Sequence, residues 1–143
     1  MKQPEPGEFT WIQLTGEKAS LPGFQDFILK QAKGFEIPPA VTGKIELILE
    51  EVLLNIINYA YTGNNPGIIR AGCAFFDKNR FVIRIIDQGR PFDPSSSPGP
   101  DTTLSVEERD IGGLGIYLVH KLSDKVSYER VDGQNILDIT FKV

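Results

Sequence analysis

Residues 45–60 read IELILEEVLLNIINYA, the clearest periodic pattern in the chain. At 3.6 residues per turn, the apolar side chains of this stretch fall on one face of a helix. That face consists of Ile45, Ile48, Leu49, Val52, Leu53, Ile56 and Ala60. Pro38 and Pro39 can open the helix at no cost in hydrogen bonds, and the turn signal Gly63-Asn64-Asn65-Pro66-Gly67 ends it. We predict a helix from Pro38 to about Tyr61 that packs on a sheet.

A polar stripe borders this apolar face. Glu51, Asn55 and Asn58 fall within roughly 60° of one another on the same helical wheel. A polar group at the margin of a buried face needs a hydrogen-bond partner or a ligand, because leaving it unsatisfied costs about 1–3 kcal/mol. Taken alone, Glu51 and Asn55 are better explained by a solvated helix edge than by a binding site.

Strand and helix signals lie on both sides of this helix. The predicted order is strand, helix, helix, two strands, a long loop, a helix and two strands. This order is typical of the α/β class, here an α+β two-layer sandwich with a mixed, mostly antiparallel sheet and helices on one face. The predicted elements are a strand at 9–14, a helix at 21–33 closed by Gly34, a hairpin of 68–76 and 80–87, a helix at 113–123, and a hairpin of 126–130 and 136–143 around Asp132-Gly133.

Asp87 ends the second strand of the first hairpin. A period of two places Phe81, Ile83, Ile85 and Asp87 on one face of that strand, so this carboxylate ends an apolar row. Two interpretations follow. Asp87 either caps the turn that begins at Gln88 or accepts a hydrogen bond from a group in a pocket beneath the helices.

A long loop follows Asp87. Pro91, Pro94, Pro98 and Pro100, together with three consecutive serines, prevent a helix or a central strand there. Loops of about twenty residues are uncommon in a compact domain and usually form a functional lid or are disordered. We place this segment, a candidate lid, at about residues 89–112.

The run Gly112-Gly113-Leu114-Gly115-Ile116 directly precedes a predicted helix. Glycines let backbone N–H groups approach an anion, and a helix N-terminus favours phosphate. The run lacks the third glycine and the preceding strand of a dinucleotide fingerprint, and it lacks the Gly-Lys-Ser/Thr of a P-loop. A simple turn therefore explains it equally well when it is taken alone.

Composition excludes several classes of protein. The chain has 143 residues, of which 41% are hydrophobic and 24% charged, and a net charge of −4. We expect one domain over residues 1–143, because a chain of this length can bury its own core. The acidic balance argues against direct binding of nucleic acid or an anionic membrane. No apolar run can span a bilayer and residues 1–6 lack a signal-peptide core, so we expect a cytoplasmic protein.

Side-chain chemistry is also restricted. Cys73 is the only cysteine and His120 the only histidine. The sequence therefore excludes internal disulfides and zinc sites built from several Cys or His ligands. Cys73 lies within a predicted strand and is expected to be a small buried residue, whereas His120 is expected to face solvent. Any chemistry must depend on carboxylates, amides and backbone groups.

The three motifs occur in a specific order. They are residues 51–61 (EVLLNIINYAY), residues 87–94 (DQGRPFDP) and residues 107–119 (EERDIGGLGIYLV). In this combination the sequence resembles the GHKL ATPase superfamily of gyrase, mismatch-repair and histidine-kinase nucleotide domains. More narrowly, it looks like the anti-sigma-factor serine/threonine kinases of the RsbW and SpoIIAB type. The resemblance spans roughly Phe9 to Val143 and implies the Bergerat ATP-binding fold.

The resemblance implies roles for individual residues. Glu51 would be the catalytic general base, and Asn55 would bind ATP through Mg²⁺. Asp87 would accept the adenine amino group, beside Gly89. The remaining ATP-binding residues that it implies are Pro91 and Phe92 at the start of the candidate lid, Arg109 within it, and Gly112, Gly113, Leu114, Gly115 and Ile116 at the phosphates. The sequence departs from the family at Tyr59, where several members have a histidine. Family ATP sites often use a threonine on a late strand, but Thr140 alternates with Leu137, Ile139 and Phe141 and is expected to face away from the core, so it is not assigned to the site.

The resemblance also implies a function. The protein would bind a sigma factor or a similar regulator and phosphorylate an anti-sigma-factor antagonist protein on Ser or Thr. An alternative is a nucleotide-gated partner-switching module without kinase turnover, and a third possibility is a domain that binds only protein. A homodimer is also expected, because related proteins dimerise and because Leu54, Ile57 and Tyr61 lie off the main core arc of their helix.

Overall fold

The protein is described here from a computed structural model that covers residues 7–60, 67–91 and 118–143. Five strands form one sheet in the order β1-β2-β3-β5-β4, and each neighbouring pair is antiparallel. The strands are β1 (Thr10–Thr15), β2 (Ile68–Phe76), β3 (Arg80–Asp87), β4 (Lys125–Val131) and β5 (Gln134–Lys142).

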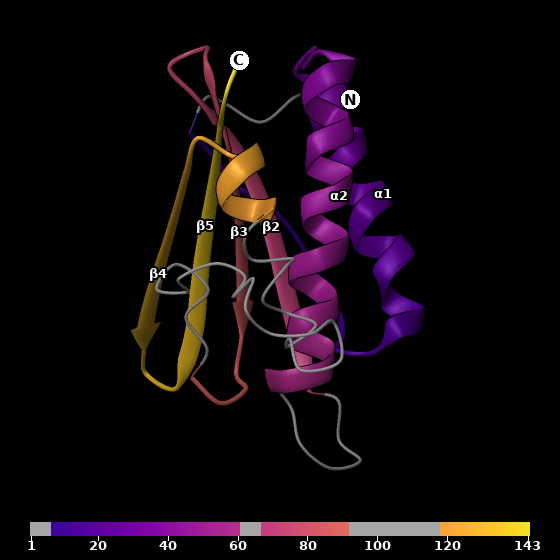
Figure 1. The fold of residues 1–143 in the computed structure, drawn as a ribbon, viewed down its shortest axis with the longest axis vertical. Helices are drawn as coiled ribbons and strands as arrows, with labels where there is room; N and C mark the ends of the chain where they lie inside the picture. Colours follow the sequence, from indigo (N-terminus) through magenta and orange to yellow (C-terminus); the bar gives the residue numbers. More distant parts are fainter. Residues whose placement is uncertain (1–6, 61–66, 92–117) are drawn as a thin grey trace, which may run out of the picture.

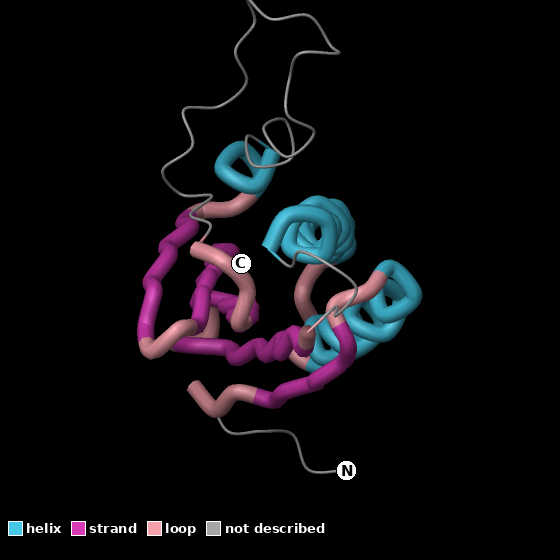
Figure 2. The backbone as a smooth tube through the Cα atoms, turned by 90° about the horizontal axis from the view of Figure 1, so that it is seen from below, coloured by secondary structure: helices cyan, strands magenta, loops and turns pink. Residues whose placement is uncertain are grey.

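Two long helices cover one face of this sheet. They are α1 (Leu21–Gly34) and α2 (Pro39–Asn55), with a 3-10 turn, η1 (Lys18–Ser20), before α1 and a π-helical turn, η2 (Ile56–Ala60), after α2. Residues 118–122 are also helical. Figure 1 shows α1 and α2 side by side, with the sheet beside them. Figure 2 shows the same arrangement from below, where the strands curve around the helices.

The predicted fold class is confirmed. The order of elements agrees with the sequence-based prediction, and the described strands pair only in antiparallel fashion. The first hairpin has the predicted bounds, because its strands alternate clearly and Asp77-Lys78-Asn79 turns the chain. Two details differ from the prediction. Gly34 is the last residue of α1 rather than its stop, and Glu36 is the residue there with a left-handed φ, of 61°.

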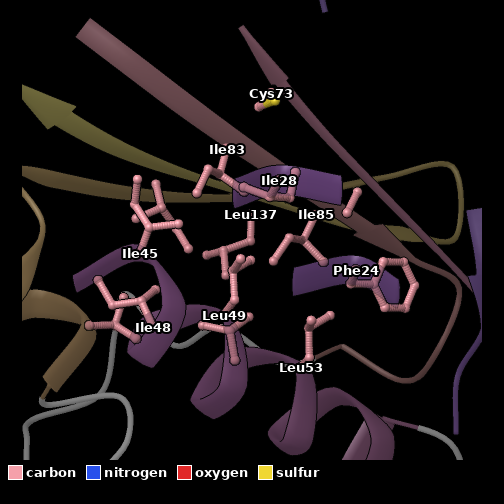
Figure 3. Packing of buried hydrophobic residues seen from close by; sticks show 14 of the residues in the cluster. Phe24, Ile28, Ile45, Ile48, Leu49, Leu53, Cys73, Ile83, Ile85 and Leu137 are labelled. Atoms are coloured by element: carbon pink, nitrogen blue, oxygen red, sulfur yellow. The ribbon is translucent and has the colours of Figure 1, made fainter. Parts of the chain in front are cut away.

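The core fills the space between the helices and the sheet. Figure 3 shows side chains of α1 and α2 packed against residues of β3 and β5. Phe24, Ile48 and Ile83 are among the side chains with no exposed surface. Each large apolar side chain that is buried contributes about 1.5–3 kcal/mol relative to leaving it in water. The face of residues 45–60 that the sequence assigned to the core is buried from Ile45 to Ile56, as predicted.

The other face of the sheet carries a different set of side chains. The ring of Trp11 lies on Gly72, where an added Cβ atom would stand 2.5 Å from a ring carbon. Arg84 donates two hydrogen bonds to Asp138, at 2.7 and 2.9 Å. A hollow of about 550 Å³ is lined on this side by residues that include Trp11, Arg84, Ile86 and Asp138. We call this the uncovered face.

Within the described ranges, no helix is both long enough and apolar enough to cross a membrane. Cys73 is buried in β2, as predicted. Its thiol lies 3.8 Å from the hydroxyl of Thr10, and burial raises its pKa to about 11. His120 is exposed on the helix of residues 118–122, also as predicted.

Candidate functional site

The C-terminal end of α2 carries the first pair of predicted site residues. Asn55 is the last residue of α2 and is only 5% exposed, while Glu51, one turn earlier, is partly buried. The side chain of Asn55 takes no hydrogen-bond partner from the described residues. In the described part of the chain, every side-chain nitrogen or oxygen that is fully buried has a hydrogen-bond partner. The Asn55 amide has none, so it is not fully buried and keeps some contact with solvent. It is a buried polar group that remains available to a ligand.

A π-helical turn follows Asn55 directly, and the sequence did not predict it. The prediction continued an α-helix to about Tyr61, but residues from Ile56 to Ala60 wind more widely. The wider turn moves later side chains around the axis. Asn58 is exposed whereas Asn55 is buried, so the predicted polar stripe runs from a buried position to an exposed one. Such π turns within helices occur frequently at functional sites.

Asp87 lies at the end of β3 and is 3% exposed. Its Oδ1 accepts a hydrogen bond from the backbone N–H of Gly89, at 2.9 Å. Asp87 therefore caps the turn after β3, as one of the two interpretations of the sequence held. Its Oδ2 takes no donor from the described residues and, by the same reasoning as for Asn55, reaches open space. The second interpretation, a hydrogen bond from a bound group, thus remains available to this oxygen.

Asn135 is the buried partner of Asp87 that the sequence analysis missed. It lies directly opposite Asp87 in the register of β3 and β5 and is 3% exposed. Its Nδ2 donates to Oδ1 of Asp87 at 3.0 Å and to the backbone oxygen of Arg90 at 2.8 Å. A signal for it was present, because Asn135 continues the period-two row of Leu137, Ile139 and Phe141.

Two side chains of β4 complete this network. The hydroxyl of Tyr128 donates to Oδ1 of Asn135 at 2.5 Å, and the guanidinium of Arg130 donates to the same oxygen at 3.1 Å. Arg130 also donates to the backbone oxygen of Gly89 at 2.7 Å. The β4–β5 hairpin therefore holds both Asp87 and the turn that follows it.

The pKa of Asp87 is raised above its usual value. Burial is the main cause, because it disfavours the charged carboxylate. The hydrogen bonds from Asn135 and Gly89 and the charge of Arg130 all act in the opposite direction. The network thus offsets part of the cost of keeping a carboxylate at this buried position.

The structure brings some predicted site residues to one end of the molecule. Figure 1 shows that the C-terminal end of α2, the end of β3 and the β4–β5 turn lie at the same end. Glu51 and Asn55 belong to α2 and Asp87 ends β3, while the buried Gly89 and the exposed Pro91 follow β3. The predicted residues Phe92, Arg109 and 112–116, with most of the candidate lid, lie outside the described residues.

Thr140 lies away from this site. It pairs with Val82 and Lys125, in a row that faces away from the helices, so the alternation in the sequence placed it correctly.

The basis of the predicted homodimer is weaker than the sequence indicated. Ile57 is partly buried against the core rather than lying off the core arc, because η2 changes the winding. Tyr61 lies outside the described residues.

Comparisons with known proteins agree with this fold. The model of the histidine kinase-like ATPase domain matches residues 14–141. The chain is similar to serine/threonine-protein kinase BtrW of Bordetella bronchiseptica, with 29% identity over 96 residues that cover 67% of each protein. It is also similar to serine-protein kinase RsbW of Bacillus velezensis, with 28% identity over 64% of this chain and 59% of that protein.

A further relative and a solved structure show the same likeness. The identity to RsbW of Staphylococcus epidermidis is 31%, over 67% of this chain and 63% of that protein. The chain therefore spans less than two thirds of the length of these RsbW proteins. The structure of the RsbU and RsbW domains of Rv1364c from Mycobacterium tuberculosis matches 95% of this chain and 32% of that one, with a TM-score of 0.67. At 13% identity that likeness concerns the fold alone. Since the family model covers most of its length, the chain belongs to the histidine kinase-like ATPase (GHKL) family.

Proposed function

We propose that this protein is an ATP-binding serine/threonine protein kinase of the anti-sigma-factor type. It binds a sigma factor or a similar regulator in the cytoplasm and phosphorylates an antagonist protein. The observation that carries the proposal is the buried row of Asp87 and Asn135, which leaves one carboxylate oxygen available at the same end of the molecule as Glu51 and Asn55. The kinase names of the relatives agree with it.

Asp87 provides the recognition of the base. Its Oδ2 accepts the exocyclic amino group of adenine, while Oδ1 remains bonded to Gly89 and Asn135. A hydrogen bond to a charged group contributes about 1.5–3 kcal/mol. Gly89 is itself buried next to this carboxylate, and its lack of a side chain leaves room for the base.

Asn55 fits a Mg²⁺ site. Its amide is buried and takes no partner from the described residues, and an amide oxygen is a ligand that Mg²⁺ accepts. No group of three or more His, Cys, Asp or Glu side chains suited to a metal is found in the described part of the chain. Such a sparse protein contribution suits Mg²⁺, which keeps several waters and binds phosphate oxygens. When bound, the ion neutralises charge on the phosphates.

Glu51 acts as the general base. It takes the proton of the substrate Ser or Thr hydroxyl as that oxygen forms a bond to the γ-phosphorus of ATP. The bond between the γ-phosphorus and the bridging oxygen breaks, and ADP leaves. Arg109 and residues 112–116 supply charge and backbone N–H groups to the phosphates, as the family resemblance implies. These residues lie outside the described ranges.

A phosphate-transfer assay tests the proposal. The protein is incubated with Mg²⁺, γ-labelled ATP and a purified anti-sigma-factor antagonist from the same organism. We expect label on a Ser or Thr of the antagonist. Glu51→Gln should keep nucleotide affinity and lose transfer by about 10²-fold or more, whereas Asn55→Ala should weaken binding of Mg-ATP itself. Normal ATP binding without transfer would refute the kinase and favour the nucleotide-gated binding module.

A further inference from the structure

The site has a second property that concerns the choice of purine. A carboxylate has two oxygens with about four lone-pair positions between them. With both oxygens available, it could pair with the two adjacent N–H groups that guanine presents, much as it pairs with an arginine fork. Adenine presents a single exocyclic amino group and needs only one carboxylate oxygen. Whichever oxygens are already occupied therefore determine which base fits.

In this protein Oδ1 of Asp87 is occupied. The N–H of Gly89 and the Nδ2 of Asn135 both donate to it, at 2.9 and 3.0 Å, and together they use its two lone pairs. Only Oδ2 remains. A guanine placed here would leave one N–H donor without an acceptor, and an unsatisfied buried donor costs about 1–3 kcal/mol.

The amide of Asn135 is fixed in the orientation that this selection requires. Its Oδ1 faces two donors, the hydroxyl of Tyr128 and the guanidinium of Arg130. Its Nδ2 faces two acceptors, Oδ1 of Asp87 and the backbone oxygen of Arg90. Turning the amide over would set donor against donor and acceptor against acceptor, so the network determines which end is the nitrogen.

We propose that Asn135, held by Tyr128 and Arg130, is a positioning residue that makes the site select adenine over guanine by occupying Oδ1 of Asp87. This inference rests on the proposed nucleotide-binding function and extends it. None of the three side chains is assigned a contact with the base. They act through Asp87 by limiting it to one free acceptor.

Competition binding tests the inference. A fluorescent ADP analogue is displaced by Mg-ATP or Mg-GTP, and the ratio of the two dissociation constants is measured. Wild type should favour ATP by about tenfold or more. Asn135→Ala removes one of the two donors to Oδ1 and leaves only the N–H of Gly89 there, so Oδ1 gains one free lone pair and the ratio should fall by about fivefold to tenfold. Tyr128→Phe loosens the amide without removing it and should lower the ratio by about twofold to threefold.

Thr140→Ala is the matched control, because Thr140 lies on the same strand as Asn135 but on the opposite face of the sheet. The ratio of the ATP and GTP dissociation constants of this variant should equal that of wild type. A fully folded Asn135→Ala or Tyr128→Phe variant with an unchanged ratio would overturn the inference while leaving the proposed function intact. Binding of neither nucleotide by wild type would instead overturn the proposed function, and the inference with it.

Discussion

Strands β3 and β5 pair along their length, and every second pair of residues faces the helices. The two ends of this row of pairs differ in chemistry, although both are buried. At one end Phe81 pairs with Phe141, and both are almost completely inaccessible to solvent. At the other end Asp87 pairs with Asn135 in the same register, also buried. The apolar pair stabilises the fold by leaving water. The polar pair costs desolvation, which its hydrogen bonds only offset, so under the proposed function its role lies in nucleotide binding rather than in stability.

The largest effect is expected at the apolar end. Phe81→Ala removes a fully buried ring and leaves a cavity, so it should lower the free energy of unfolding by about 3–5 kcal/mol. Urea denaturation followed by circular dichroism measures this loss. A loss below about 1 kcal/mol would show that the ring does not pack as the structure places it.

The polar end should behave in the opposite way. Asp87→Asn puts an NH₂ group or a neutral oxygen where the free carboxylate oxygen lies, so ATP affinity should fall by about tenfold to a hundredfold. The free energy of unfolding should stay the same or rise, because a desolvated charge is removed. Calorimetry and urea denaturation measure the two quantities.

Asp138→Asn is the matched control for this comparison, since Asp138 bonds to Arg84 on the uncovered face. Its ATP affinity should not change. If both substitutions weakened ATP binding equally, recognition of the base could not be assigned to Asp87.

A third substitution examines the uncovered face. Gly72→Ala places a Cβ atom against the ring of Trp11, which must move to make room. We expect a loss of about 1–3 kcal/mol in the free energy of unfolding, with ATP affinity unchanged. Trp11 is the only tryptophan, so its fluorescence reports both the displacement and the unfolding transition. An unchanged emission spectrum and stability would contradict the close contact.

The smallest effect concerns pH. Burial raises the pKa of Asp87 in the folded protein above its value of 3.8 in the unfolded chain. The contribution of this carboxyl group to the free energy of unfolding is therefore fully present below pH 3.8, and it is lost as the pH rises through the pKa of the folded protein. Asn at position 87 does not titrate, so the stability of Asp87→Asn relative to wild type should be greater at pH 7 than at pH 4. Denaturation at both pH values measures this, and the reverse order would contradict it.

The sequence predicted most of the fold because its signals are local. The hairpin of β2 and β3 follows from alternation and a turn, and the core face of α2 follows from the helical period. The polar network could not be predicted in the same way. Asn135 meets Asp87 only because β5 pairs with β3 across 48 residues of sequence, and no local pattern specifies that pairing. The π-helical turn η2 was not predicted, because Ile56 and Ala60 continue the apolar period of α2 through it.

Recognition of the base by Asp87 would place ATP on the helix-covered face of the sheet. Two-dimensional NMR of the labelled protein, titrated with Mg-ATP, reports on both faces of the sheet at once. We expect the signals of the Gly89 backbone amide and the Asn135 side-chain amide to shift, and the indole N–H signal of Trp11 to stay where it is. Shifts at Trp11 without shifts at Gly89 and Asn135 would place the nucleotide on the uncovered face and refute base recognition by Asp87.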